Sequence, residues 1–276
     1  MGELRDRFAT LVSAGEDMDL AAGALEIARI GYPALDPAPS LRQLDRLAAN
    51  ARRSVALDGP PEIAVAALAT YLGDECGFRG NQDDYYDPRN SFLNDVLERR
   101  TGIPISLAVV LLETASRVGL AVEGVGFPGH FLVRVQGSTA PVFFDPFFGG
   151  RTIGDVELLA RYRALSGNET AALPSDALAP TARPGILARM LRNLLRLYLE
   201  RRDHSHALAA VDLLLVLHPD SADELRVRGL LYEHLECFGA ALDDLRHYLT
   251  LAPGAPDAEA IRQHVARLAR AAAAVH

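Results

Sequence analysis

The stretch that decides the fold is GIPISLAVVLLETASRVG, residues 102–119. Pro104 opens an almost continuous apolar run, and Gly119 follows its last residue. Proline at the start and glycine just past the end are typical boundaries of an α-helix. Its most apolar stretch, Ile103 to Leu112, is about half the roughly 20 residues that a membrane span needs, so we expect a buried helix of a globular protein.

Upstream of this helix, the pattern predicts a helical front over residues 1–75. Apolar residues recur at helical spacing, and proline or capping residues mark the boundaries. A polar loop, GDECGFRGNQDDYYDPRN (73–90), then precedes a short predicted helix, SFLNDVLERR (91–100). The predicted front helices are LAAGALEIARIGYP (20–33), LRQLDRLAANARRSVAL (41–57) and EIAVAALATYLG (62–73).

Downstream of Gly119 the pattern changes to short segments typical of β-strands. They are rich in aromatic and β-branched residues and are bounded by Gly and Pro. A helix, DVELLARYRALS (155–166), follows them, and the proline-rich stretch 167–185 is the best linker candidate. The predicted strand segments are AVEGVGFPGH (121–130), FLVRVQG (131–137) and PVFFDPFFGG (141–150).

An internal repeat of 34 residues occupies the C-terminal part of the chain. Four residues recur at this one offset, which indicates two copies of a helix–turn–helix unit. The second copy has a small residue, Gly229, where the first has Leu195. A last helical segment, APDAEAIRQHVARLARAAAAV (255–275), would cap the stack, because an isolated repeat cannot bury its apolar face. The repeated pairs are Leu191 and Leu225, Tyr198 and Tyr232, Ala207 and Ala241, and Pro219 and Pro253.

The composition excludes several classes of function. All 28 basic residues are Arg, which excludes a P-loop ATPase and Schiff-base or pyridoxal enzymes, since these need a Lys. The formal net charge of −8 argues against a general nucleic-acid binder. Without Lys, the protein also has no side-chain amine with which to cross-link itself.

Cysteine usage and the N-terminal sequence predict a cytoplasmic protein. The chain has only two Cys, too few for a disulfide scaffold. The start, MGELRDRFATL, has mixed charge where a signal peptide would have an apolar core. We also expect no metal and no cofactor: His204-Ser-His206 lacks a third ligand, and Asp83, Asp84 and Asp87 lack the pattern of a calcium loop.

Histidine placement points to one candidate site. Seven of the eight His lie at or beyond residue 204, so His130 is the only imidazole available in the front part. Asp145 lies in the next predicted strand, and adjacent antiparallel strands bring such side chains about 5 Å apart at Cβ. Ser106 falls in the first turn of the apolar helix, where free backbone N–H groups could activate a nucleophile and hold an oxyanion. The three residues together suggest a nucleophile, a base and its orienting carboxylate.

The motifs GIPISLA, FPGHF and DPFFGG, in this order, resemble the transglutaminase-like core, and specifically the bacterial SirB-type family, which joins this core to C-terminal tetratricopeptide repeats. The resemblance implies an α+β, mainly helical, papain-like core with a small antiparallel sheet, followed by a helical repeat domain. The expected domains are 1–166 (front 1–75, core 76–166), a linker 167–185 and repeats 186–276. The catalytic triad of this superfamily is Cys-His-Asp. The resemblance implies that His130 matches the general base and Asp145 the carboxylate that orients it. Ser106 matches the nucleophile position, so the Cys is absent here.

Two functions remain open at this stage. In the first, Ser106, His130 and Asp145 form an active hydrolase or acyltransferase acting on a peptide amide or ester. In the second, the core is catalytically silent and the protein is a regulatory or interaction protein whose repeats bind a partner protein or peptide. The loss of Cys favours the second. Cys76 is a weaker substitute nucleophile, because its acidic neighbours Asp74 and Glu75 would raise the pKa of its thiol.

Overall fold

The chain forms two compact units, each described here by itself. The structure is a computed structural model that describes residues 2–274. Residues 14–190 form one unit, called the core unit below. The residues up to Ser13 and those from Leu191 onward form the other, called the repeat unit.

These boundaries differ from the predicted ones at two places. The first helix, α1 (Gly2–Val12), belongs to the repeat unit, where it packs against α9 (His204–Leu217) and its Phe8 is fully buried. The predicted linker 167–185 lies inside the core unit, because β7 (Pro180–Thr181) within it pairs with a strand of the sheet. Composition alone gave no sign of this pairing, since only two residues of the stretch take part.

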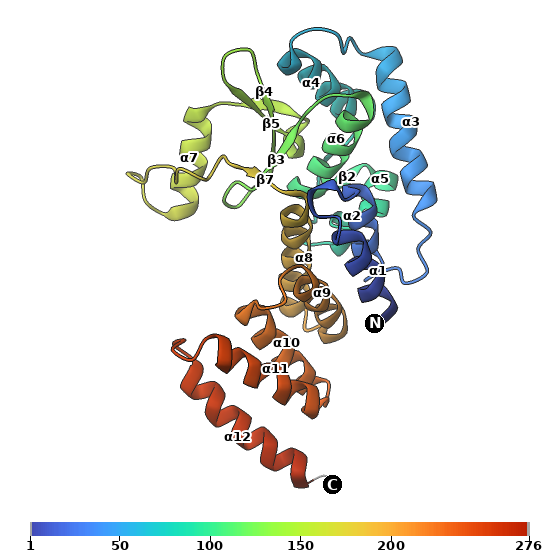
Figure 1. Ribbon diagram of the computed structural model, residues 1–276. Helices are drawn as coiled ribbons and strands as arrows, with labels where there is room; N and C mark the ends of the chain where they lie inside the picture. The colour runs from blue at the N-terminus through green and yellow to red at the C-terminus, as the bar shows by residue number, and fades with distance from the viewer. Residues whose placement is uncertain (1, 275–276) are drawn as a thin grey trace. The chain divides into compact units, whose positions relative to one another are not determined.

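Helices make up most of the core unit (Figure 1). The apolar helix predicted after residue 102 is α6, which begins at Pro104 and ends at Val118, with Gly119 left-handed at φ 89° as its C-cap. The other helices are α2 (Leu20–Ala28), α3 (Ala38–Ser54), α4 (Pro61–Thr70), α5 (Leu93–Arg99), α7 (Asp155–Ser166) and the first part of α8 (Arg183–Glu200). Short helical turns are η1 (Gly15–Asp17), η2 (Tyr71–Glu75), η3 (Pro88–Asn90) and η4 (Pro146–Phe148).

The core unit holds a five-stranded antiparallel sheet with the strand order β6-β5-β4-β3-β7. The fold class predicted from the sequence, a mainly helical α+β core with a small antiparallel sheet, is confirmed. Two residues each from β1 (Arg79–Gly80) and β2 (Thr101–Gly102) form a separate parallel pair. The remaining strands are β3 (Glu123–Val125), β4 (Leu132–Gln136), β5 (Pro141–Asp145) and β6 (Arg151–Ile153).

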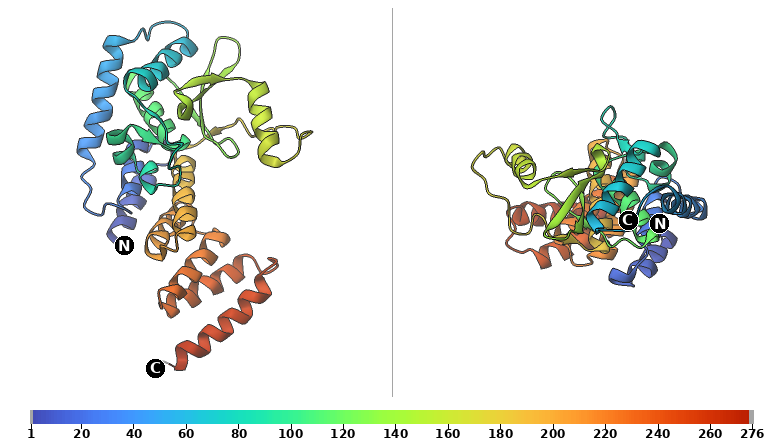
Figure 2. Two further views of the ribbon diagram at one scale, coloured as in Figure 1. Left: turned by 180° about the vertical axis from the view of Figure 1, so that it is seen from behind. Right: turned by 90° about the horizontal axis from the view of Figure 1, so that it is seen from above.

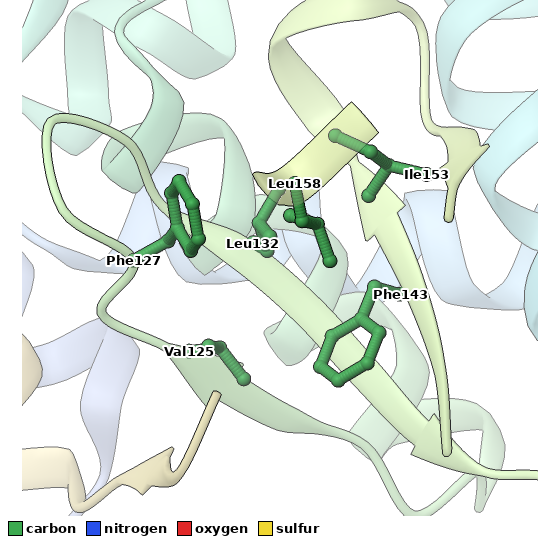
Figure 3. Close-up of a cluster of buried hydrophobic side chains, with 6 residues drawn as sticks. All are labelled: Val125, Phe127, Leu132, Phe143, Ile153 and Leu158. Atoms are coloured by element: carbon green, nitrogen blue, oxygen red, sulfur yellow. The ribbon is translucent and has the colours of Figure 1, made fainter. Parts of the chain in front are cut away.

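The two faces of this sheet are covered by different helices (Figure 2). Successive side chains of a strand point to opposite faces. On one face, β4 contacts α4 and α6, and β5 contacts α4. On the other face, α7 closes an apolar cluster through Leu158 (Figure 3). The cluster consists of Val125, Phe127, Leu132, Phe143, Ile153 and Leu158.

The repeat unit contains the two predicted helix pairs and the capping helix. The first pair is α8 with α9, and the second is α10 (Ala222–His234) with α11 (Phe238–Leu251). Helix α12 (Ala258–Ala274) packs against α11. A Cβ at Gly229 would come within 2.8 Å of Leu245, so the small residue allows α10 and α11 to approach closely.

Buried ion pairs connect the helices within the repeat unit. Arg228 on α10 donates to Asp212 of α9 at 2.9 Å and to Asp244 of α11 at 2.7 Å. Asp212 and Asp244 are both buried residues. Removing a single partner from such a buried set would leave an uncompensated charge, so the three residues hold three helices in register.

The role of α7 as a cover for the sheet gives a stability prediction. Leu158→Ala should lower the free energy of unfolding of the core unit by about 2–5 kcal/mol, because Leu158 is fully buried and truncation leaves a cavity. Val156→Ala on the same helix should change it by less than about 0.5 kcal/mol, because Val156 is 86% exposed. Chemical denaturation of both variants measures the difference. Equal effects would contradict the packing described here.

Candidate functional site

His130 lies in a tight turn just before β4. Its backbone N–H donates to the carbonyl of Phe127 at 3.0 Å, and Gly129 supplies the left-handed residue of the turn at φ 68°. From outside the turn, Arg189 Nη2 donates to the carbonyls of Phe127 at 2.8 Å and His130 at 2.6 Å. One guanidinium therefore fixes both ends of the turn that carries the imidazole.

Asp145 ends β5 and is fully buried. Its Oδ1 accepts from His130 Nε2 at 2.8 Å and from the backbone N–H of Phe147 at 3.2 Å, while Oδ2 accepts from Arg161 Nη1 at 2.8 Å. Burial opposes ionisation, but the hydrogen bonds and charges of His130 and Arg161 outweigh it and hold the pKa of Asp145 below its usual value. The carboxylate is thus shared between an imidazole and a guanidinium.

Aromatic rings surround the imidazole. The ring of Phe148 stacks on His130 with centroids 6.3 Å apart, and Phe147 meets it edge-on at 6.1 Å. Tyr85 of the polar loop lies edge-on to Phe147 at 6.0 Å. The side chain of His130 is 13% exposed and Phe148 is 43% exposed, so one side of this aromatic group faces solvent.

Arg151 and Arg161 add charge beside these rings. The two guanidiniums lie over Phe148 at 5.7 Å and 5.3 Å from its centroid. Both also bind Glu157, and these contacts, with that of Arg151 the larger, lower the pKa of Glu157 to about 2. The surroundings of His130 therefore carry paired charges of both signs.

Ser106 is fully buried at the start of α6, and its hydroxyl is already bound. Its Oγ donates to the carbonyl of Asn90 at 2.6 Å and accepts from the N–H of Ile103 at 3.1 Å. The second contact is half of a capping box, in which a side chain satisfies a free N–H at the helix start. His130 is not a partner of this hydroxyl, so the structure brings together two of the three predicted site residues.

Asn90 in turn holds the polar loop. Its Nδ2 donates to the carbonyls of Asp84 at 2.7 Å and Tyr85 at 3.2 Å, and its Oδ1 accepts from Asn81 at 3.1 Å. Asn90 is fully buried. Ser106 thus acts locally as the anchor between α6 and this loop.

Cys76, Asp87 and Arg134 each interact with a neighbouring side chain of the fold. Cys76 follows η2 beside Tyr71, and burial together with that thiol raises the pKa of Tyr71 to about 12. Arg134 pairs across the sheet with Glu123 at 2.8 Å. Asp87 binds Arg89 and caps η3. Within the part of the chain that the structure describes, no three His, Cys, Asp or Glu side chains gather as a metal site would require.

Two residues of this site escaped the sequence analysis. Arg161 lies on α7 and reaches Asp145 from outside the strand pair, and Arg189 comes from α8. Neither position carries a local sequence signal beyond an arginine in a helix. Only the tertiary fold reveals that these guanidiniums face the His130 turn.

The chain matches two known families. Residues 39–192 match the transglutaminase-like superfamily, and residues 194–266 match the tetratricopeptide repeat. Together with the fold, the first match defines the class: the chain belongs to the transglutaminase-like superfamily, and tetratricopeptide repeats follow its core. No solved structure matches the chain.

Similar proteins identify the family of this chain within the superfamily. A UPF0162 protein of Xylella fastidiosa is 40% identical over 258 residues, which is 92% of this chain and 91% of that protein. One from Vibrio cholerae is 30% identical over 253 residues, covering 90% and 92%. The chain belongs to the UPF0162 family. It also resembles F-box only protein 21 of Homo sapiens, with 35% identity over 209 residues, or 68% of this chain and 32% of that protein.

The shared carboxylate of Asp145 predicts a pH dependence of stability. Because its pKa is lowered in the folded state, ionised Asp145 stabilises the fold above its unfolded pKa of about 3.9, and this contribution is lost as the pH falls further. Asp145→Asn should therefore unfold more easily at neutral pH and lose less stability on acidification. Denaturation from pH 7 to pH 3 tests this, with the exposed Asp176→Asn as control. Parallel curves for wild type and Asp145→Asn would contradict the prediction.

Proposed function

We propose that this protein is a non-catalytic member of the transglutaminase-like superfamily that acts by binding a partner protein or peptide through its repeats. The observation that carries the proposal is the fully buried hydroxyl of Ser106, hydrogen-bonded to Asn90. A nucleophile must reach the substrate and pass its proton to a base. This hydroxyl faces a backbone carbonyl instead.

The electrostatics around His130 support the same proposal. A general base becomes an imidazolium during the reaction, and the orienting carboxylate stabilises that charge. Here the carboxylate of Asp145 also binds Arg161, so the guanidinium would repel the imidazolium at the same carboxylate. The pair of His130 and Asp145 then serves to fix the turn and the strand end.

The repeats supply the interaction function in this proposal. Tetratricopeptide repeats commonly present extended surfaces that bind peptides. None of the helices within residues 2–274 has the length and apolar character of a membrane-crossing helix. The SirB-type resemblance adds the expectation of a regulatory role in the bacterial cytoplasm.

A second candidate function is a Ser-His-Asp hydrolase or acyltransferase. It is favoured by the 2.8 Å hydrogen bond between His130 and Asp145, and by His130 Nδ1, which makes no hydrogen bond within residues 2–274. This function would require Ser106 to leave its bonds to Asn90 and Ile103 and reach the imidazole.

A fluorophosphonate probe separates the two candidates. We expect no labelling of the full chain, because the probe needs an exposed hydroxyl activated by a base. Intact-mass measurement gives the result, with a known serine hydrolase as positive control. Labelling of the wild type that disappears in both Ser106→Ala and His130→Ala would overturn the non-catalytic proposal.

Site-specific cross-linking tests the interaction function. A photo-reactive residue in place of Leu199 or Leu251, each 39% exposed in the repeat unit, should give discrete protein adducts in living bacteria. The same residue at Val156 or Leu165, exposed on α7 of the core unit, should give few. Adducts that form only from α7 would show that the repeats are not the binding surface.

A further inference from the structure

A second feature of the core unit, separate from His130, is a cavity of about 290 Å³. It lies between the second half of α6, the edge of the sheet at β3 and β7, and the first turn of α8. Small-ligand pockets start at roughly 300 Å³, so the space suits a compact molecule. The lining includes Leu20, Leu112, Glu113, Ser116, Glu123, Arg183 and Ile186.

The lining combines apolar side chains with one buried carboxylate. Leu20, Leu112 and Ile186 are each less than a tenth exposed, and so is Glu113. Glu113 Oε2 accepts from Arg117, and the same guanidinium binds Asp45 at 2.9 Å. One guanidinium therefore serves two carboxylates.

The other oxygen of Glu113 is open. Oε1 makes no hydrogen bond to any residue in the range 2–274, and it is not among the polar atoms sealed from solvent. Burial raises the pKa of Glu113, although Arg117 opposes the shift. Because Oε1 is open to the cavity, a hydrogen-bond donor that enters the cavity can bind to it.

Carboxylates outnumber basic side chains in the lining of the cavity. Glu16 and Glu113 contribute carboxylates, whereas Glu123 is already paired with Arg134 at 2.8 Å. The one basic residue of the lining, Arg183, donates its Nη1 to the carbonyl of Met18 at 2.7 Å. An anionic ligand would meet Glu113 unfavourably, while a cationic one would supply the donor that Oε1 lacks.

We propose that this cavity binds a small organic cation, with a guanidinium or ammonium head on Glu113 Oε1 and its hydrocarbon part against Leu20, Leu112 and Ile186. The cation is either a free amine or guanidine or the side chain of a basic residue in a peptide. The proposal stands independently of whether His130 has any catalytic role.

Calorimetric titration of the full chain tests the charge requirement. Ethylguanidinium and n-butylammonium should bind saturably at one site, and the neutral analogue N-butylurea should not. Glu113→Gln should weaken cation binding by about tenfold or more, since a charge-assisted hydrogen bond is lost. Equal binding of the neutral analogue, or no saturable cation binding, would overturn the proposal.

Matched variants locate the site and guard against misfolding. Glu123→Gln removes a carboxylate that Arg134 already pairs, so it should change cation affinity by less than twofold. Ser116→Phe should block the cavity from its exposed rim, whereas Ser166→Phe at the end of α7 should not. Equal losses in Glu113→Gln and Glu123→Gln would mean general surface attraction and would refute a built site.

A further comparison identifies the source of the cation. The capped tripeptide Gly-Arg-Gly and its citrulline counterpart differ in the charge of one side chain. Tighter binding of the arginine peptide than of ethylguanidinium would assign the cavity to a peptide side chain. Weaker binding would assign it to a free small cation. Equal binding of the arginine and citrulline peptides would contradict a cation site.

Discussion

The hydrogen bond from Ser106 Oγ to the carbonyl of Asn90 joins the two parts of the core unit on which the candidate site depends. Ser106 begins the buried helix α6, and Asn90 holds the polar loop that carries Tyr85. Tyr85 lies against Phe147, which in turn borders His130. A hydroxyl bound in this way stabilises the fold. Because its proton is donated to a backbone carbonyl, it is not placed to act as a nucleophile.

Like Ser106, Asp145 joins separate parts of the core unit through its hydrogen bonds. A carboxylate that orients a catalytic imidazole normally serves that imidazole. Asp145 also receives Arg161 from α7, so it connects the His130 turn, the end of β5 and the covering helix. His130 and Asp145 are placed as the base and the carboxylate of a catalytic triad would be. The charges around them, however, form a network of ion pairs that stabilises the fold. In our proposal the residues of the triad-like site stabilise the core, and the repeats bind the partner protein or peptide.

Much of the fold follows from sequence, and the site follows only in part. Pro104 and Gly119 bound α6 because their backbone preferences act locally, and the 34-residue offset reveals the repeat helices. The pairing of His130 with Asp145 was predictable from adjacent strands. The direction of the Ser106 hydroxyl was not, since its partner Asn90 lies 16 residues away in a loop without regular spacing. The contact between Arg161 and Asp145 was not predictable either, because it depends on how α7 packs on the sheet.

The most direct test of this account is the accessibility of the Ser106 position itself. In Ser106→Cys, iodoacetamide at neutral pH should leave the introduced thiol unmodified in the folded chain, because the position is fully buried, while the exposed Cys237 reacts as an internal control. Peptide mass mapping after brief labelling gives both extents. Alkylation of the introduced thiol faster than Cys237, and slowed by His130→Ala, would reveal an accessible activated thiolate and contradict the account.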